Sequence, residues 1–307
     1  MASGMSAGQW LQLNLTGLTT ELFVNGANNT LGYMDKGCHD PVRKQVRFIG
    51  QAHMGDQRFH QYDEVTNTFS NISDPSWDSG GLSYPGYLGH GYQHNAMDPA
   101  TGDLYYRKYN SSSVHRLNRA TGQWSTIASA PNTEITGGLE WLPNIGTQGG
   151  LILFLGTSCH RWDKATNAWS TPASGSISGM TYHTVAVRSV TTNQVLFGGG
   201  NGGRSMWKIG ASGGATSCPA CPIGFGIGSS VSTACPVSGD LLVINSSSSV
   251  AKFSVSGNRW TQFSFSGGPS FGAISAGSHT IAIPMAAYGV IMFVFGNSPS
   301  AWLYKHA

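Results

Sequence analysis

The sequence predicts an all-β protein, a single six-bladed β-propeller closed by an N-terminal strand in its last blade. Three observations predict this fold. An aromatic residue or a leucine followed by a short polar turn recurs six times, at spacings of 45 to 55 residues. Each repeat carries four short strand patterns, and no helical periodicity competes with them. The last repeat ends after its third strand pattern, and the N-terminus carries a fourth.

The recurring position marks one strand in each repeat. A second aromatic residue follows it seven positions later in four repeats, across a turn of small and polar residues. Units of about 40 to 50 residues with four strands each are typical of β-propellers. We therefore expect the Trp residues of the second position to pack between blades. The six first positions are Tyr62, Leu117, Trp162, Trp207, Phe253 and Trp302, and the Trp residues of the second position are Trp10, Trp124, Trp169 and Trp260.

The other strands follow in a regular order. A strand of alternating character comes first, as at 183–187, and an apolar strand ending in glycine follows, as at 195–200. The segments at 279–283 and 291–296 repeat this order, which predicts that the fourth and sixth blades share one register. Asp40 and Asp98 each precede a proline, so we expect hairpin turns in which the Asp side chain bonds its own backbone.

The N-terminal segment 8–13 matches the strand that begins at Gly122, with Trp10 at the position of Trp124. We expect it to complete the sixth blade, because closing the ring removes exposed sheet edges. The predicted organisation is a short lead at 1–7 and a propeller at 8–307. A count of seven blades is the alternative.

Composition limits the classes of function. Charged residues make up 10% of the chain and the net charge is +3, with no cluster of Lys or Arg. Nucleic acid is therefore not expected as a main partner, because phosphate binding needs a basic stripe. No apolar stretch reaches the roughly 18 residues of a membrane helix, and the N-terminus lacks the pattern of a secretory leader. These features suggest a virion component or an extracellular protein.

Charge is also unevenly distributed. Residues 1–163 hold 13 of the 14 acidic residues and 10 of the 17 basic ones, whereas 164–307 hold only Asp240 and seven bases. Protein interfaces are depleted in Asp, Glu and Lys, so this second half is a candidate surface for other subunits of an assembly. The alternative is a polar outer surface that binds nothing.

The five cysteines are odd in number, so at least one is free or pairs with another chain. Three of them could supply thiolates for zinc, although the spacing fits no common zinc motif. Buried thiols or one disulfide are the alternatives. The possible zinc ligands are Cys218, Cys221 and Cys235, and the other two cysteines are Cys38 and Cys159.

In a propeller, the loop after the second strand of each blade and the segment before its first strand reach the same face, around the central channel. That face collects the candidate binding residues, together with the long loop 74–91, which carries several aromatic residues. Capping of the seam between the first two blades is the alternative role of this loop. The candidates are Trp77, Tyr84, Tyr87, His90, Tyr92, His94, Asn110, Tyr182, His183, Asn201, Arg204 and His279. The same face is expected to hold His53, Asp56, Arg58, Asn245 and Asn297.

The segment from Tyr182 to Gly200, followed by Trp207, resembles a kelch repeat, and the resemblance extends over nearly the whole chain. It implies a propeller and by itself no activity. One kelch family, galactose oxidase with its glyoxal oxidase relatives, binds copper through two tyrosines and two histidines, one tyrosine being cross-linked to a cysteine. Segments here are similar to those of that family, which implies a copper site. The implied ligands are Tyr92, Tyr182, His183 and His279, with Cys38 one blade ahead of Tyr92. The family differs in having seven blades and additional β-domains.

A second enzymatic hypothesis is polysaccharide lysis, since some lyases are propellers that use Tyr and His as acid and base. The candidate catalytic residues are Tyr92, His94, Tyr182, His183 and Arg204. They would have to lie within hydrogen-bond reach of one substrate.

The leading hypothesis is a non-enzymatic binding or structural module without a cofactor. Its most concrete form is a phage tail or capsid-associated component that contacts other protein subunits or a host-surface glycan.

Overall fold

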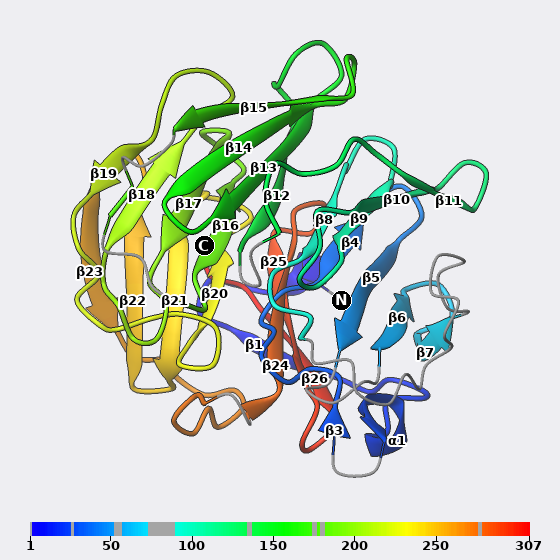
Figure 1. Ribbon diagram of the computed structural model, residues 1–307. Coiled ribbons are helices and arrows are strands. Elements are labelled where there is room, and N and C mark those ends of the chain that lie inside the picture. The colour runs from blue at the N-terminus through cyan, green and yellow to red at the C-terminus, as the bar shows by residue number, and fades with distance from the viewer. Residues whose placement is uncertain are drawn as a thin grey trace.

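The computed structural model describes residues 2–25, 28–51, 57–72, 90–133, 137–173, 177–178, 182–275 and 278–307. Figure 1 shows six antiparallel sheets arranged around a centre, each with four strands. The predicted six-bladed propeller is therefore confirmed. No helix among these residues is long and apolar enough to cross a membrane.

The first three blades follow one another in chain order. Blade 1 contains β4 (Cys38–Asp40), β5 (Gln45–Gln51), β6 (Gln57–Asp63) and β7 (Thr68–Ile72). Blade 2 contains β8 (Asn95–Met97), β9 (Leu104–Arg107), β10 (Val114–Asn118) and β11 (Gln123–Thr126). Blade 3 contains β12 (Leu139–Leu142), β13 (Gly150–Leu155), β14 (Ser158–Asp163) and β15 (Ala168–Ala173).

The other three blades complete the ring. Blade 4 contains β16 (Val185–Ser189), β17 (Gln194–Gly198), β18 (Met206–Ile209) and β19 (Thr216–Cys218). Blade 5 contains β20 (Val231–Ala234), β21 (Leu241–Ser246), β22 (Ser249–Ser254) and β23 (Arg259–Phe263). Blade 6 contains β24 (Thr280–Met285), β25 (Val290–Phe295), β26 (Ser300–Tyr304) and β1 (Trp10–Leu13). Four short elements lie outside the blades: η1 (Ala2–Gly4), α1 (Thr20–Phe23), β2 (Val24–Asn25) and β3 (Asn28–Asn29).

The N-terminal strand closes the ring, as the sequence predicts. In Figure 1 the blue β1 lies beside the red β26, and Trp10 pairs with Tyr304. Their rings stack with centroids 4.4 Å apart. The Gly8 amide extends the ladder by donating to the carbonyl of Lys305 at 2.7 Å.

The blades adhere through the apolar faces of their sheets. All six residues of β13 are buried, because both faces of this strand meet a neighbouring blade. Aromatic pairs join adjacent blades: Tyr105 stacks on Trp141 at 5.3 Å, and Phe154 stacks on Phe197 at 3.5 Å between ring centroids. Burial of such rings is the main favourable term in the assembly of the ring.

The strand register corrects two of the six repeat positions. Trp162 pairs with the second residue of β13. At the same place in blades 4 and 6 stand Ile209 and Tyr304, two residues beyond Trp207 and Trp302. Side chains two residues apart point to the same side of a strand, so the pattern of aromatic residues does not reveal a shift of two. The two tryptophans therefore lie outside the repeated packing position, although their shared register was predicted correctly.

Side chains from the innermost strands fill the centre of the ring. The carboxylate of Asp35, before blade 1, accepts a hydrogen bond from Gln93 of blade 2 at 2.7 Å and one from the backbone amide of Ser232 in blade 5 at 3.1 Å. Lys36 forms an ion pair with Glu140 of blade 3 at 2.7 Å. The bonds to Ser232 and Glu140 join blade 1 to blades that are not its neighbours, so a polar network crosses the axis.

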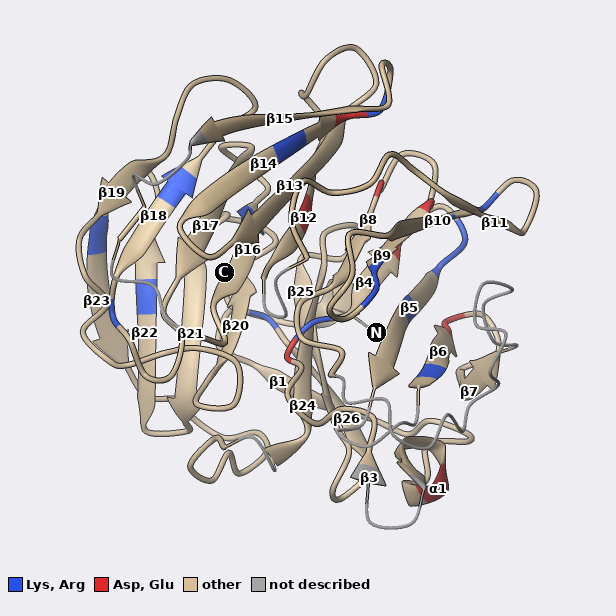
Figure 2. Cartoon of the chain, in the orientation of Figure 1, with Lys and Arg blue, Asp and Glu red and all other residues tan. Residues whose placement is uncertain are grey.

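Most ion pairs lie on the face opposite to the candidate site. Asp40 accepts from the backbone amides of its own turn, as predicted, and pairs with Arg119 of blade 2 at 3.7 Å. Lys164 of blade 3 pairs with Asp98 at 2.9 Å. Figure 2 shows the acidic segments gathered on the half of the ring that holds β6 to β12. Blades 1 to 3 are thus joined by ion pairs, whereas blades 4 to 6 carry basic residues but only one acidic residue, Asp240.

Candidate functional site

Four residues that precede the first strand of a blade have an unusual backbone. Tyr33, Tyr92, His183 and His279 have φ angles of 52°, 39°, 71° and 47°, in the left-handed region. Non-glycine residues rarely adopt this conformation, and such residues concentrate at functional sites when the surrounding structure enforces them. In blade 5 the corresponding residue is Gly228, with a φ of 83°. The turn therefore recurs around one face of the ring and directs large rings toward its mouth.

Three of these residues meet in one aromatic cluster. The His183 ring lies 5.1 Å from Tyr33 and 5.7 Å from Tyr92, between ring centroids. Tyr182 contacts both His183, at 4.5 Å, and Tyr92, at 6.5 Å. We call the whole set the mouth cluster, and it consists of Tyr33, His90, Tyr92, Tyr109, Tyr182 and His183.

The protonation states in the cluster favour neutral groups. Tyr92 is 1% exposed. Its burial is the main cause that raises the pKa of its phenol well above the usual value, and a hydrogen bond with Tyr182 adds to the effect. Desolvation lowers the pKa of His183. Its Nδ1 donates to Oδ1 of Asn201 at 2.8 Å, which leaves Nε2 of the neutral ring as an acceptor. The cluster therefore offers hydroxyl and imidazole groups without a fixed charge.

The cluster is arranged in depth. Within the cluster, Tyr92 and His90 are buried, Tyr33, Tyr109 and His183 are half-buried, and Tyr182 is 42% exposed. The partly exposed rings of Tyr33, Tyr182 and His183 thus rest on the buried rings of Tyr92 and His90. Sequence reasoning named four of the six residues but missed Tyr33 and Tyr109. Nothing in the repeat marks Tyr33, because its importance lies in a backbone angle.

Other candidates lie around this cluster with different roles. His94 is fully buried and forms a hydrogen bond of 3.1 Å with Arg107 inside blade 2. Asn110, Asn201 and Arg204 are exposed on loops that follow the second strands of their blades. His53, Asp56, Trp77, Tyr84 and Tyr87 lie outside the described residues.

His279 is near Tyr33 and outside the mouth cluster. Tyr33 and His279 line one small cavity together with Ser278 and Ser230. The His279 Nδ1 donates to Oδ1 of Asn297, as His183 does to Asn201, so the two blades repeat one arrangement. His279 therefore extends the face beyond the mouth cluster.

The copper site implied by the resemblance fits only in part. Tyr92, Tyr182 and His183 converge, but Cys38 packs with Ile49 and other residues of the seam between blades 1 and 2. Tyr92 packs in a different cluster, so the Cys–Tyr pair of that family is not reproduced. The residues present therefore do not fit the copper centre of that family.

The three cysteines considered for zinc are buried and free. Cys218 and Cys221 pack in one apolar cluster, whereas Cys235 accepts a hydrogen bond from the backbone amide of Ser238 in a turn of blade 5. Across the part of the chain that the structure describes, no group of three His, Cys, Asp or Glu residues is placed to hold a metal ion.

Two of the candidate catalytic residues of the lyase hypothesis are too deeply buried to reach a substrate. Of its five residues, Tyr92 and His94 are almost completely buried, and the side chain of His94 is engaged with Arg107. A general acid or base must reach the proton it transfers directly or through one water. Tyr182 and His183 are the members of that set that lie both together and open to solvent.

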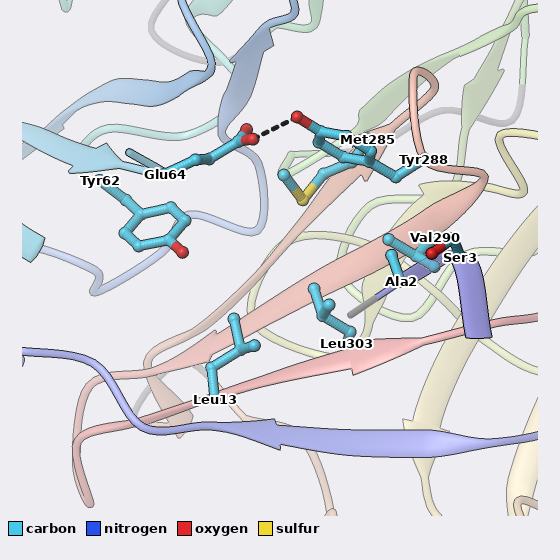
Figure 3. Close-up of a pocket in the computed structure, with 9 residues that line it drawn as sticks. All are labelled: Ala2, Ser3, Leu13, Tyr62, Glu64, Met285, Tyr288, Val290 and Leu303. Carbon is cyan, nitrogen blue, oxygen red and sulfur yellow. Dashed lines mark hydrogen bonds between the residues drawn. The ribbon is translucent and has the colours of Figure 1, made fainter. Parts of the chain in front are cut away.

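A separate cavity of about 320 Å³ lies on the other face, where blades 6 and 1 meet. Figure 3 shows its apolar walls, which include Leu13 and Leu303, and a hydrogen bond from the Tyr288 hydroxyl to Glu64 at its edge. The other carboxylate oxygen of Glu64 is 2.8 Å from His39 Nε2. Glu64 is thus engaged by both Tyr288 and His39, and the cavity lies in the seam where the last blade meets the first.

No protein-family model matches the chain, and no curated protein sequence matches it. Solved structures do share the fold. A fungal alcohol oxidase of the AA5 family, in complex with copper, is 9% identical; the match covers 98% of this chain and 76% of that chain, with a TM-score of 0.53. A Bacteroides thetaiotaomicron protein of unknown function is 11% identical, with coverages of 97% and 76% and a TM-score of 0.60. A chain of a nidogen/laminin complex is 9% identical, with coverages of 74% and 78% and a TM-score of 0.51.

At these identities the likeness shows the fold alone. The propellers that share it include a copper enzyme and a component of a protein complex. The fold therefore does not decide between catalysis and binding. What the comparisons establish is a β-propeller loosely similar to the propeller domain of galactose oxidase.

Proposed function

We propose that this propeller is a binding module that takes a neutral carbohydrate at the mouth cluster, as part of a larger assembly such as a virion. The observation that carries the proposal is the partly exposed surface formed by Tyr33, Tyr182 and His183 over buried Tyr92. Aromatic faces stack on the apolar faces of sugar rings, and neutral phenol, imidazole and amide groups exchange hydrogen bonds with hydroxyls.

Rigidity favours this role. The left-handed turns fix the ring positions before a ligand arrives, and Asn201 holds the orientation of His183. Tyrosine loses little conformational entropy on binding, since it has only two side-chain torsions. A preorganised site of this kind binds without the cost of ordering its own residues.

The assembly part of the proposal is supported by the charge distribution. Blades 4 to 6 carry one acidic residue, Asp240, so the ion pairs of blades 1 to 3 have few counterparts there. The outer strand β23 exposes Arg259, Thr261 and Gln262 and no acidic residue. A surface of this composition suits contact with another subunit.

The direct test is a glycan array followed by calorimetry with the best neutral ligand. We expect Tyr182→Ala to weaken binding at least tenfold and Tyr182→Phe to retain most of it, because stacking requires the ring. Tyr288→Ala, on the opposite face, is the matched control and should bind like the wild type. Absence of any glycan ligand, or unchanged affinity in Tyr182→Ala, would contradict the proposal.

A further inference from the structure

A groove of about 360 Å³ lies between blade 6 and the segment that joins blades 5 and 6. Three adjacent strands line it: β1 through Gln12, β25 through Phe295, and β26 through Ser300 and Trp302. The loop that joins the two blades forms the opposite wall through Pro269 and Ser270. The volume lies within the range of about 300 to 1,000 Å³ that is common for small-molecule sites.

The chemistry of the groove matches that of the mouth cluster. None of the residues that line it is charged. Trp302 and Phe295 supply aromatic surface, while Gln12 and Asn297 supply amides that both donate and accept hydrogen bonds. A sugar ring presents one apolar face and a rim of hydroxyls, and this combination of side chains suits both.

Trp302 is not one of the residues that the repeat needs for packing. It stands two residues before Tyr304, which holds the repeated position. Trp207 occupies the same place in blade 4, where its indole N–H donates to the carbonyl of Ser178 at 3.1 Å. Among the described residues, no hydrogen bond of the Trp302 indole is found. Its N–H is therefore available to a ligand in the groove.

Shared residues link the groove to the mouth cluster. Tyr33 belongs to the mouth cluster and also lines the small cavity with Ser278 and His279. Ser278 in turn lines the groove, as does Asn297, which accepts the hydrogen bond from His279. One uncharged polar and aromatic path thus connects Tyr33 to Trp302 across blade 6.

We propose that the groove is a second sugar subsite, and that the ligand is a linear oligosaccharide running from the mouth cluster to Trp302. This inference rests on the carbohydrate-binding function proposed above and specifies its ligand as a chain of several sugars. Linking two subsites through one ligand raises affinity because the second contact becomes intramolecular.

The test is a calorimetric length series, from two to six sugars, of the neutral backbone that binds best on the glycan array. The wild type should gain at least tenfold in affinity between the shortest and the longest member. Ser298→Trp fills the groove from an exposed position and should abolish this gain. Ser256→Trp, at an exposed turn of blade 5, is the matched control and should keep it.

Trp302→Phe provides a second measurement, because it preserves an apolar ring while removing the indole N–H. It should reduce the gain several-fold, with thermal unfolding confirming that the variant is folded. If short glycans bind and longer ones bind no better, or if Ser298→Trp keeps the gain, the second subsite is wrong while the mouth site stands. If no glycan binds at any length, both proposals are wrong.

Discussion

Several residues at the centre and mouth of this ring adopt conformations or ionisation states that reduce the stability of the fold. Tyr33, Tyr92, His183 and His279 adopt left-handed backbone angles, each costing on the order of 1 kcal/mol or more. Gly228 meets the same need in blade 5 without that cost. The sequence identified His183 and His279 as residues preceding a strand, but backbone angles cannot be predicted from residue type. Tyr33 was therefore overlooked.

Asp35 has a different cost, the burial of its carboxyl group, and this cost makes stability depend on pH. Burial raises the pKa of its carboxyl from 3.8 to about 6, against opposing hydrogen bonds from Gln93 and Ser232 and the charge of Lys36. Because the folded state binds the proton more tightly than the unfolded state, ionisation destabilises the fold. This cost is complete above about pH 6, amounts to up to about 3 kcal/mol, and disappears below about pH 4.

The measurement is denaturant unfolding of the wild type and of Asp35→Asn at pH 7.5 and pH 4.5. Between these pH values the wild type should gain about 2 kcal/mol relative to the variant. Buried His60, whose pKa is lowered to about 3 by desolvation, destabilises the fold on acidification, but it does so in both proteins. Identical pH profiles would show that Asp35 titrates normally.

At the scale of the element, β1 decides whether the ring is closed. Its pairing with β26 and the stacking of Trp10 on Tyr304 follow from the match between 8–13 and the outer strands of other blades. This part of the fold was predictable, because the repeat showed which strand each blade contains. The positions of Trp207 and Trp302 were not, since a shift of two residues keeps the same face inward.

Trp10→Ala should lower the free energy of unfolding by about 3 kcal/mol, since it removes the aromatic contacts of β1 with Phe293 and Tyr304 of the last blade. Trp124→Ala, at the equivalent position of blade 2, is the reference and should cost a similar amount. Chemical denaturation measures both. If Trp10→Ala stayed within about 0.5 kcal/mol of the wild type, β1 would not contribute to closure.

At the scale of the whole molecule, the two halves of the ring differ in the interactions that join their blades. Ion pairs such as Lys164 with Asp98 join blades 1 to 3, whereas blades 4 to 6 rely on apolar seams. The uneven count of acidic residues showed this division in the sequence. It could not show that the charges bond one another across blades, since that depends on which turns lie side by side.

The half of the ring that is poor in acidic residues, blades 4 to 6, is expected to mediate self-association or contact with another subunit. Light scattering at micromolar concentration should report a mass above that of one 32.4 kDa chain. The double change Thr261→Glu with Gln262→Glu adds charge to the exposed edge strand β23 and should shift the protein toward the monomer. A wild type that is monomeric at all concentrations would leave self-association without support.

The central claim, that the mouth cluster binds carbohydrate, is tested most directly by a crystal structure with the best neutral oligosaccharide from the glycan array. The account predicts one sugar ring against Tyr182 and Tyr33, with a hydroxyl in hydrogen-bond contact with Nε2 of His183. Further sugars should extend past His279 toward Trp302. A ligand bound elsewhere on the ring, with the mouth cluster empty, would contradict the account.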